Sequence, residues 1–171
     1  MNVAIISSSL NPESKGYIMC RKLEEKFISK GLNVVFIDAK DYKLSPVFQD
    51  SKDNERLAEK LKDVDHFVFG MALYNYSFND NLKLILDNCV DPKNEHSLFG
   101  IVCAAGGDKS YLSTMHLSQV CMNEWRMIQL PRVIYATGKD FDENGIHSED
   151  LLDRIEKFAK EFIEVGSKLL S

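Results

Sequence analysis

The sequence lacks the marks of several large classes of protein. Its 21 basic residues are outnumbered by 26 acidic ones, which gives a net charge of −5, and no lysine or arginine stripe runs along it, so no nucleic-acid partner is expected. No apolar run approaches the ~20 residues that cross a bilayer, so no membrane partner is expected either. The first residues read as a strand and not as a secretory signal, which predicts a cytoplasmic protein.

Cysteine is also scarce. The four cysteines form no C-x-x-C pair, and their spacing suits neither a zinc site nor an iron–sulfur cluster, so no metal is expected. One lies in an apolar run and three lie in helical patterns, where a thiol commonly serves as a small core side chain. One reactive thiol among them is the alternative. They are Cys20, Cys89, Cys103 and Cys121.

Two further absences narrow the chemistry. The sequence contains neither G-x-G-x-x-G nor a Walker A loop. It also shows no obvious catalytic triad or carboxylate dyad. A reaction carried by a bound cofactor needs no such acid–base pair, because the cofactor supplies the chemistry and the protein supplies position and electrostatics.

What is present is a regular alternation of strands and helices. At 171 residues, 44% hydrophobic and 27% charged, the chain is predicted to fold as a single domain over residues 1–171. Short apolar runs predict strands, and helical spacing of apolar residues predicts helices between them. Strands are expected at residues 3–6, 32–38, 66–71 and 98–105 and within residues 127–137, and helices at 15–30, 54–62, 79–89, 110–125 and from 148 onward.

This alternation predicts an α/β fold. Strand–helix–strand units favour parallel strands joined by right-handed crossovers. The small size and the polar loop after the first strand favour a flavodoxin-like three-layer sandwich with a five-stranded parallel sheet of order 2-1-3-4-5. Pro131 is expected to mark the start of the fifth strand. The apolar pair at residues 47–48 is expected to tuck against the edge of the sheet.

The first strand runs into a serine-rich turn that precedes a helix. Ser7, Ser8 and Ser9 follow the apolar run, and Ser14 stands directly before helical periodicity begins at Lys15. Free backbone N–H groups and the helix dipole converge at such a junction, so the turn is predicted to bind a phosphate. The alternative is a plain helix cap, in which the Ser14 hydroxyl accepts from an N–H two or three residues on.

Two other strand ends carry unusual residues. The stretch 72–78, ALYNYSF, combines aromatic rings with an amide side chain, which favours a wall against a flat polar heterocycle over simple loop packing. Gly106 and Gly107 follow Ala105 at the end of the fourth strand, and glycine permits close approach of the backbone to a ligand. A tight turn that needs glycine for its geometry alone is the alternative. Ligands bind at the carboxyl ends of strands in such sheets, so the three loops predict one site.

With these loops in place, the sequence resembles the NAD(P)H-dependent FMN reductase family, a flavodoxin-like group that includes azo-, quinone- and chromate-reducing enzymes. The first loop of the family reads Gly-Ser-x-Arg-x-x-Ser, and residues 8–14 occupy those places. The third loop reads Pro-x-Tyr-Asn-x-Ser followed by Leu-Lys-Asn-x-x-Asp, and residues 72–77 and 82–87 match it well. The resemblance covers essentially the whole chain.

The resemblance implies where FMN binds. The phosphate would lie on the first loop, the isoalloxazine and ribityl chain beside the third, and the flavin edge against the fourth, with no side chain in a catalytic role. The candidate cofactor-binding residues, including a serine and a lysine that flank the phosphate loop, are Ser7, Ser9, Asn11, Ser14, Lys15, Leu73, Tyr74, Asn75, Tyr76, Ala105, Gly106 and Gly107.

The sequence departs from the family pattern at three places. Asn11 stands where the family usually has arginine, so a fixed cation at the phosphate is lost, and Lys15 is a partial replacement nearby. Ala72 replaces the proline of the third loop. Residues 108–110 replace a glycine-rich, arginine-containing run that in the family helps to admit the nicotinamide cofactor.

The function implied by the resemblance is an FMN-dependent NAD(P)H oxidoreductase. Hydride passes from the nicotinamide to flavin, and a small-molecule electron acceptor of the flavin, quinone or azo type then takes the electrons. The altered residues 108–110 motivate an alternative, an FMN-binding electron carrier or redox sensor without efficient NAD(P)H oxidation. A third reading is an interaction module that has lost the flavin. The resemblance further implies a homodimer or homotetramer, with the helix at 79–89 and the helix after the fourth strand as candidate contact surfaces.

Overall fold

The computed structural model describes residues 1–91 and 95–171 and places a sheet at the centre of the protein. The sheet has the order β2-β1-β3-β5, and β6 and β7 then both pair in parallel with β5. The predicted order of five parallel strands is therefore confirmed, with the fifth position divided between two short strands. The parallel strands are β1 (Asn2–Ser7), β2 (Asn33–Asp38), β3 (His66–Tyr74), β5 (Leu98–Ala105), β6 (Ile128–Gln129) and β7 (Ile134–Thr137).

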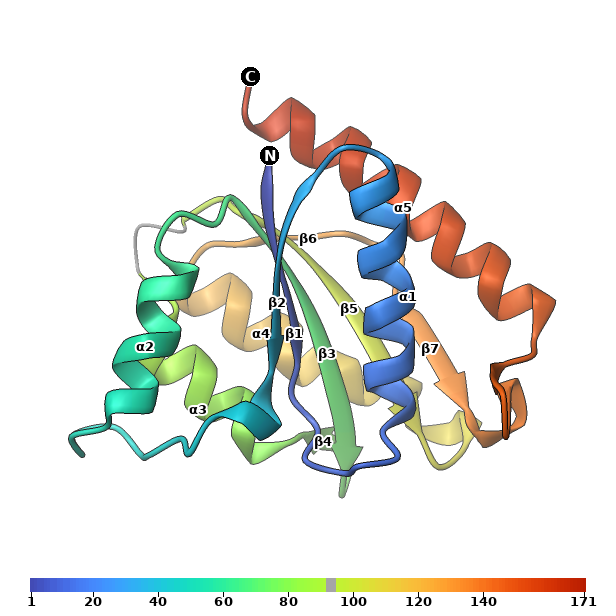
Figure 1. Ribbon diagram of the computed structural model, residues 1–171, viewed down its shortest axis with the longest axis horizontal. Helices are drawn as coiled ribbons and strands as arrows, with labels where there is room; N and C mark the ends of the chain where they lie inside the picture. Colours follow the sequence, from blue (N-terminus) through green and yellow to red (C-terminus); the bar gives the residue numbers. More distant parts are fainter. Residues whose placement is uncertain (92–94) are drawn as a thin grey trace.

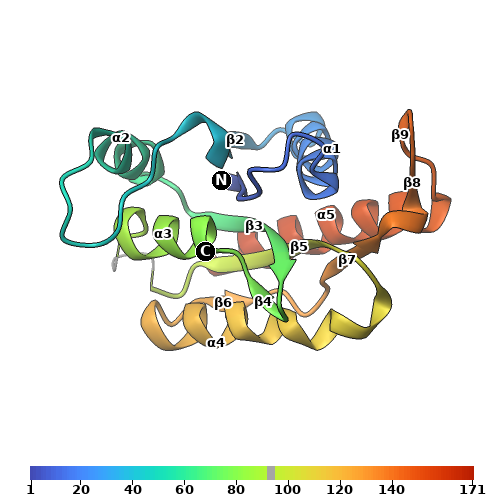
Figure 2. The same ribbon diagram turned by 90° about the horizontal axis from the view of Figure 1, so that it is seen from below.

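Helices cover both faces of this sheet, as Figure 2 shows. One face carries α1 and α5, and the other carries α2, α3 and α4. Successive side chains of a strand point to opposite faces, so Val3 and Ile5 join the core under α1 and α5, while Ala4 and Ile6 join the core under the other three helices. The three-layer sandwich is confirmed. Its helices are α1 (Lys15–Ser29), α2 (Lys52–Leu61), α3 (Asp80–Cys89), α4 (Met115–Glu124) and α5 (Glu149–Leu169).

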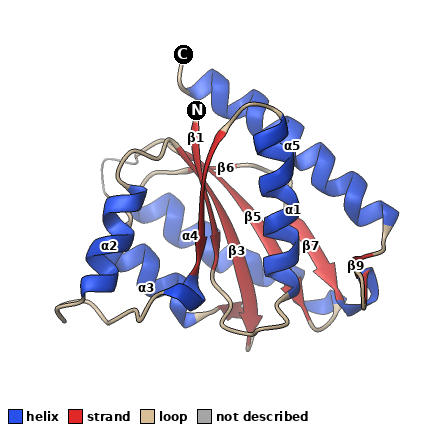
Figure 3. Cartoon of the chain, viewed as in Figure 1, coloured by secondary structure: helices blue, strands red, loops and turns tan. Residues whose placement is uncertain are grey.

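Shorter elements connect these layers (Figure 3). They are η1 (Ala39–Asp41), β4 (Ser77–Phe78), η3 (Asp108–Thr114), η4 (Gly138–Asp140), β8 (Phe141–Asp142) and β9 (Gly145–Ile146).

Among residues 1–91 and 95–171, no helix is both long enough and apolar enough to cross a membrane.

Local signals in the sequence place most helix ends. The Ser14, Ser51 and Ser148 hydroxyls each accept from the backbone N–H three residues on, at the start of α1, α2 and α5. Gly31 follows the end of α1 with a φ of +83°, the left-handed conformation in which a glycine commonly stops a helix.

Three expectations differ from the structure. β6 precedes Pro131 and β7 begins three residues after it, because proline has no N–H to give to the ladder and therefore interrupts the fifth strand. The helix expected over 110–125 begins as the 3₁₀ helix η3 and becomes α-helical only at Met115. The pair at 47–48 does not pack on the sheet, since Val47 is 41% exposed and Phe48 is fully exposed.

Strands β1, β2, β3, β5 and β7 end at one edge of the sheet, at the bottom of Figure 1, whereas β6 pairs with the first residues of β5, near the opposite edge. The loop after β1 leads into α1, the chain after β3 turns back as β4, and the loop after β5 leads into η3. This edge is where open α/β sheets hold their ligands. It is also where the three sequence-predicted loops come together.

Candidate functional site

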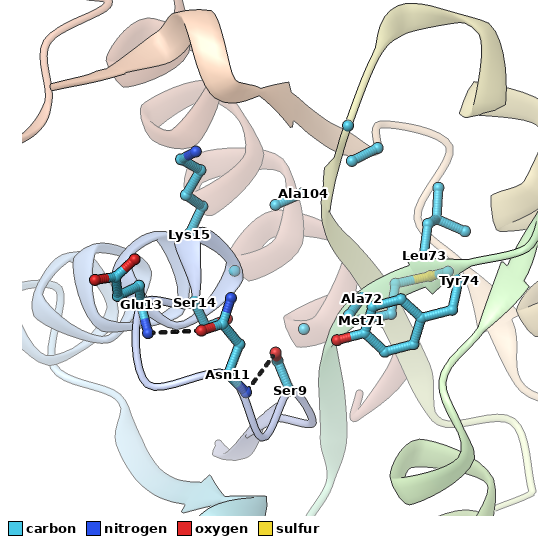
Figure 4. A pocket seen from close by; sticks show the side chains of 14 residues that line it. Ser9, Asn11, Glu13, Ser14, Lys15, Met71, Ala72, Leu73, Tyr74 and Ala104 are labelled. Carbon is cyan, nitrogen blue, oxygen red and sulfur yellow. Dashed lines mark hydrogen bonds between the residues drawn. The ribbon is translucent and has the colours of Figure 1, made fainter.

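A cavity of about 250 Å³ lies at this edge between the loop after β1 and the ends of β3 and β5 (Figure 4). It brings together most of the residues predicted from the sequence. Those that line it are Ser9, Asn11, Ser14, Lys15, Leu73, Tyr74, Ala105 and Gly106. Those placed beside it are Ser7 in β1, Asn75 and Tyr76 in a hairpin turn, and Gly107 in the loop after β5.

The N-terminus of α1 forms the floor of one half of the cavity. The Ser14 hydroxyl accepts from the Tyr17 N–H at 3.2 Å, so the plain cap predicted as an alternative is present. The cap leaves the backbone N–H groups of Lys15 and Gly16 without an acceptor in residues 1–91 and 95–171, and Gly16 is buried. An anion at this place would complete their hydrogen bonding, so cap and anion site coexist.

Asn11 is held in a defined orientation above that helix end. Its Oδ1 accepts from the Glu13 N–H at 3.0 Å, and its own N–H donates to Ser9 Oγ at 3.3 Å. Because the amide oxygen is occupied in this turn, the Nδ2 group is the part of the side chain left to donate, and Figure 4 shows it directed away from Glu13. Asn11 thus offers a neutral donor where a charged arginine was expected.

Lys15 supplies the positive charge of this half. Its Nζ lies 5.9 Å from the centroid of the Phe141 ring, and among the described residues it has no carboxylate partner. Glu13 also lines the cavity, so one acidic and one basic side chain share its rim. An unpaired ammonium beside two unpaired backbone N–H groups attracts an anion such as a phosphate.

The other half of the cavity is built from β3. This strand runs to Tyr74, so the loop predicted to start at residue 72 begins three residues later. Leu73 pairs with Phe78 and Tyr74 pairs with Ser77, which leaves Asn75 and Tyr76 as a two-residue turn. Both turn residues have positive φ, 50° and 64°, as a type I′ hairpin requires. The aromatic stretch is therefore a short hairpin in which Tyr74 and Tyr76 are exposed.

The loop after β5 closes the third side. Neither Gly106 nor Gly107 has a positive φ, and a Cβ added at either position would meet nothing within 4 Å. The protein's own geometry therefore does not require glycine here, which argues against the tight-turn alternative. Close approach of a ligand to the backbone is the physical reason that is left.

Tyr135 of β7 holds this loop in place. Its hydroxyl donates to the Gly107 carbonyl oxygen at 2.5 Å and lies 2.9 Å from Ser110 Oγ. Tyr135 is 9% exposed, and its ring packs edge-on against Tyr111, with 5.4 Å between centroids. The sequence reasoning missed this residue, because nothing in a strand pattern tells which buried tyrosine hydroxyl reaches a loop 28 residues away.

Several residues that line the cavity lie outside the set predicted from the sequence, and one of them, Gly70, could have been recognised from its place in the sequence. Gly70 interrupts the apolar run of β3, and a glycine inside a strand often marks a close approach. A Cβ added there would lie 2.3 Å from Cys20 Sγ, so the glycine lets α1 pack directly on β3. The lining residues outside the prediction are Glu13, Gly16, Gly70, Met71, Ala72 and Ala104.

The residues present fit FMN. The buried, unpaired N–H of Gly16, the Lys15 ammonium and the Ser9 hydroxyl suit its phosphate. The side chain of Leu73 and the open space at Gly106 suit a flat heterocycle. The arrangement can hold a long ligand with an anionic end and an aromatic end.

Comparisons with known proteins agree with this geometry. Residues 1–142 match the family model of the NADPH-dependent FMN reductases. An NAD(P)H-dependent FAD/FMN reductase from Geobacillus thermodenitrificans is 23% identical over 157 residues, which cover 87% of this chain and 84% of that protein.

Solved structures show the same fold. An NADH:FMN oxidoreductase in its apo form superposes with a TM-score of 0.80 at 11% identity, covering 96% of this chain and 89% of that one. The flavoenzyme NAD(P)H:(acceptor) oxidoreductase from Paracoccus denitrificans superposes with a TM-score of 0.78 at 15% identity, covering 98% of this chain and 97% of that one. At such identities the likeness establishes the fold.

Proposed function

The chain belongs to the NADPH-dependent FMN reductase family and is therefore an NAD(P)H-dependent flavin oxidoreductase, and we propose that FMN binds in the cavity at the carboxyl edge of its sheet. The observation that carries this proposal is the buried N–H of Gly16 beside the Lys15 ammonium, neither of which has a hydrogen-bond or ion-pair partner in the part of the chain that the structure describes. We propose one FMN-binding domain over residues 1–171. Its four free, buried cysteines support a cytoplasmic location.

The protein's contribution is to bind and orient. When bound, FMN supplies the hydride chemistry between the nicotinamide and the acceptor. Lys15 and the N-terminus of α1 hold the phosphate, Leu73 and Tyr74 border the ring system, and the backbone at Gly106 lies against its edge. The exposed hairpin turn at Asn75 and Tyr76 stands at the entrance, where its backbone N–H groups can meet the flavin or the incoming substrate.

The proposed acceptors are flat aromatic molecules of the flavin, quinone or azo type. Tyr74 and Tyr76 are 54% and 66% exposed on a short hairpin at the cavity rim. Exposed aromatic rings offer a stacking surface to a planar acceptor while leaving its polar edge in water. This supports a broad class of acceptors and does not select one among them.

We further propose that the protein forms a homodimer or a homotetramer. Four apolar side chains of η3 and α4 are exposed, and exposed apolar side chains that lie together mark contact surfaces between proteins. α3 lies beside this surface in Figure 2. The exposed side chains are Tyr111 (44%), Leu112 (76%), Met115 (56%) and Met122 (52%).

A second function is an FMN-binding electron carrier or redox sensor without efficient NAD(P)H oxidation. It is favoured by the loop after β5, which passes at once into the 3₁₀ helix η3 with Asp108 at its start. Residues 108–110 replace the glycine-rich, arginine-containing run that in the family helps to admit the nicotinamide cofactor. Stopped-flow reduction separates the two functions, because a carrier binds FMN but is reduced by NADPH only very slowly.

The test combines binding and turnover. Protein supplied with FMN should turn yellow. In the absence of oxygen it should oxidise NADPH in an amount equal to the bound FMN, which takes up the electrons and loses its colour. Lys15→Gln should raise the Kd for FMN roughly 10- to 100-fold, since it removes a hydrogen bond to a charged group. Lys22→Gln is the matched control, because Lys22 lies on the same helix but pairs with Glu25 at 2.8 Å. Protein that neither binds FMN nor oxidises NADPH would overturn the proposal.

A further inference from the structure

We propose that Ser8 and Asn79 form a buried polar latch that sets the distance between the phosphate half and the ring half of the cavity. Asn79 is then a positioning residue for FMN, although it lies outside the set of residues that line the cavity. The inference rests on the proposed function, because it concerns how the same cavity reaches both ends of one ligand.

The latch consists of four short contacts between side chains and backbone. Ser8 Oγ lies 2.8 Å from the Gly70 carbonyl oxygen and 2.7 Å from Asn79 Oδ1, so its single proton is shared between two acceptors. Asn79 Nδ2 donates to the Ser8 carbonyl oxygen at 2.9 Å, and Asn79 Oδ1 accepts from the Ala72 N–H at 3.3 Å. Ser8 is fully buried and Asn79 is 3% exposed.

The position of Asn79 in the fold makes this use of its side chain notable. Asn79 is the N-cap residue of α3, where an asparagine side chain ordinarily accepts from the first turn of its own helix. Its side chain makes no such bond to the described chain and turns instead to β1 and β3. The side chain that would ordinarily cap α3 is therefore used in the latch instead.

The chemistry of the latch also fixes which group can occupy position 79. The oxygen must face the Ala72 N–H and the Ser8 hydroxyl, and the nitrogen must face the Ser8 carbonyl oxygen. A reversed amide would set Nδ2 against the Ala72 N–H. A carboxylate would set an oxygen against the Ser8 carbonyl oxygen, so Asp is excluded in spite of its shape.

The latch joins β1 and β3 just beyond the point where their strand pairing ends. The β1–β3 ladder closes with the pair Ser7 and Gly70 and with a backbone bond from the Ser8 N–H to the Gly70 carbonyl oxygen at 2.9 Å. Ser8 leads directly into Ser9 on the phosphate side, whereas Ala72 leads into Leu73 on the ring side. Asn79 bonds to both chains at that point, which fixes the spacing of the two halves before a ligand arrives.

This spacing matters only for a ligand that must reach both halves. FMN has a phosphate and a ring system, whereas riboflavin has the same ring system without the phosphate. Loosening the latch should therefore weaken the binding of FMN more than the binding of riboflavin. A general loss of folded protein would weaken both ligands by the same factor, so the ratio of the two Kd values separates positioning from stability.

The experiment measures Kd for FMN and riboflavin by flavin fluorescence quenching in wild-type protein and in variants. Asn79→Ala should raise the Kd for FMN about tenfold or more, because two buried partners lose their hydrogen bonds. The riboflavin Kd should change by less than about threefold, so the preference for FMN shrinks. Asn88→Ala is the matched control, since Asn88 lies in the same helix but bonds to the Ser45 and Leu84 carbonyl oxygens.

Ser8→Ala is the second variant, in case Asn79→Ala does not fold. It removes the Ser8 hydroxyl but leaves the bonds of Asn79 to the Ser8 carbonyl oxygen and the Ala72 N–H in place. The preference for FMN over riboflavin should therefore fall, by a smaller factor than in Asn79→Ala. An unchanged ratio of Kd values in folded Asn79→Ala or Ser8→Ala, with wild-type protein binding FMN, overturns the latch alone. Wild-type protein that binds neither flavin overturns the proposed function and the latch with it.

Discussion

Among single residues, the four cysteines show most directly how burial sets chemistry. All four are buried, and desolvation raises the pKa of each thiol from 9.0 to about 12, with the charge of Asp38 adding to the effect at Cys20. The thiolate is the nucleophilic form, so none of them is reactive near neutral pH. The sequence-based expectation of core cysteines is confirmed, and the alternative of a reactive thiol is not supported.

These raised pKa values predict a loss of stability at alkaline pH. Between pH 9 and about 12 the unfolded chain releases thiol protons that the folded protein retains, so the free energy of unfolding falls as pH rises. For the fully buried Cys20 the slope is about 1 kcal/mol per pH unit. Urea midpoints measured at pH 8, 9 and 10 should decrease in that order.

Cys20→Ala separates the thiol from other groups that titrate in the same range. The variant should be less stable than wild-type protein at pH 8, because it loses buried volume. Its stability should nevertheless fall less steeply with pH. Parallel slopes for Cys20→Ala and wild-type protein would contradict the assignment.

At the scale of single strands and loops, the bounds of some elements follow from the local sequence pattern and those of others do not. β5 spans the predicted residues 98–105 without change, because an apolar strand covered on both faces has an unambiguous pattern. β3 continues three residues further than predicted, since Leu73 and Tyr74 find partners in β4. The partner strand has only two residues, which is too short a pattern to recognise in a sequence.

The loop after β5 depends on Tyr135 and carries the next prediction. Tyr135→Phe removes the hydroxyl that bonds to Gly107 and Ser110, so the backbone next to Gly106 should move more freely. We expect a loss of about 1 kcal/mol in the free energy of unfolding. We also expect the rate of flavin reduction by NADPH to fall severalfold, measured by stopped-flow absorbance in the absence of oxygen.

Tyr42→Phe is the control for this variant. Tyr42 is also buried, and its hydroxyl accepts from Lys60 Nζ at 2.9 Å, so its partner lies in α2 and not in the loop after β5. It should lose comparable stability with an unchanged rate of reduction. Equal rates in the two variants would show that Tyr135 contributes to folding and not to the site.

Across the entire fold, the exposed apolar side chains of η3 and α4 predict how copies of the protein associate. Leu112→Glu places a charge in the middle of the proposed contact, and burying an unpaired charge is unfavourable. We expect wild-type protein to sediment as a dimer or tetramer at micromolar concentration and Leu112→Glu to shift toward the monomer.

Ile28→Glu gives the matched comparison for association. Ile28 is 57% exposed on α1, on the opposite face of the sheet from α4. The charge there should leave the sedimentation of the protein unchanged. Wild-type protein that sediments as a monomer at all concentrations would rule out the proposed contact.

Local rules were enough to establish the architecture of this protein. Alternating apolar runs and helical spacing act over neighbouring residues, so they predicted the α/β layers and the cap at Ser14. The small size of the chain and the polar loop after the first strand predicted the strand order. The same rules placed the three loops at one edge, because parallel strands end together.

Contacts between distant residues settled the rest. Ser9 lines the cavity while its neighbour Ser8 bonds to Asn79, which is 71 residues away, and no local pattern distinguishes two adjacent serines. The carbonyl oxygen of Gly107, in the loop after β5, accepts a hydrogen bond from the hydroxyl of Tyr135 in β7. Such contacts depend on the register of strands and on which face each side chain occupies, and both are fixed only when the sheet is assembled.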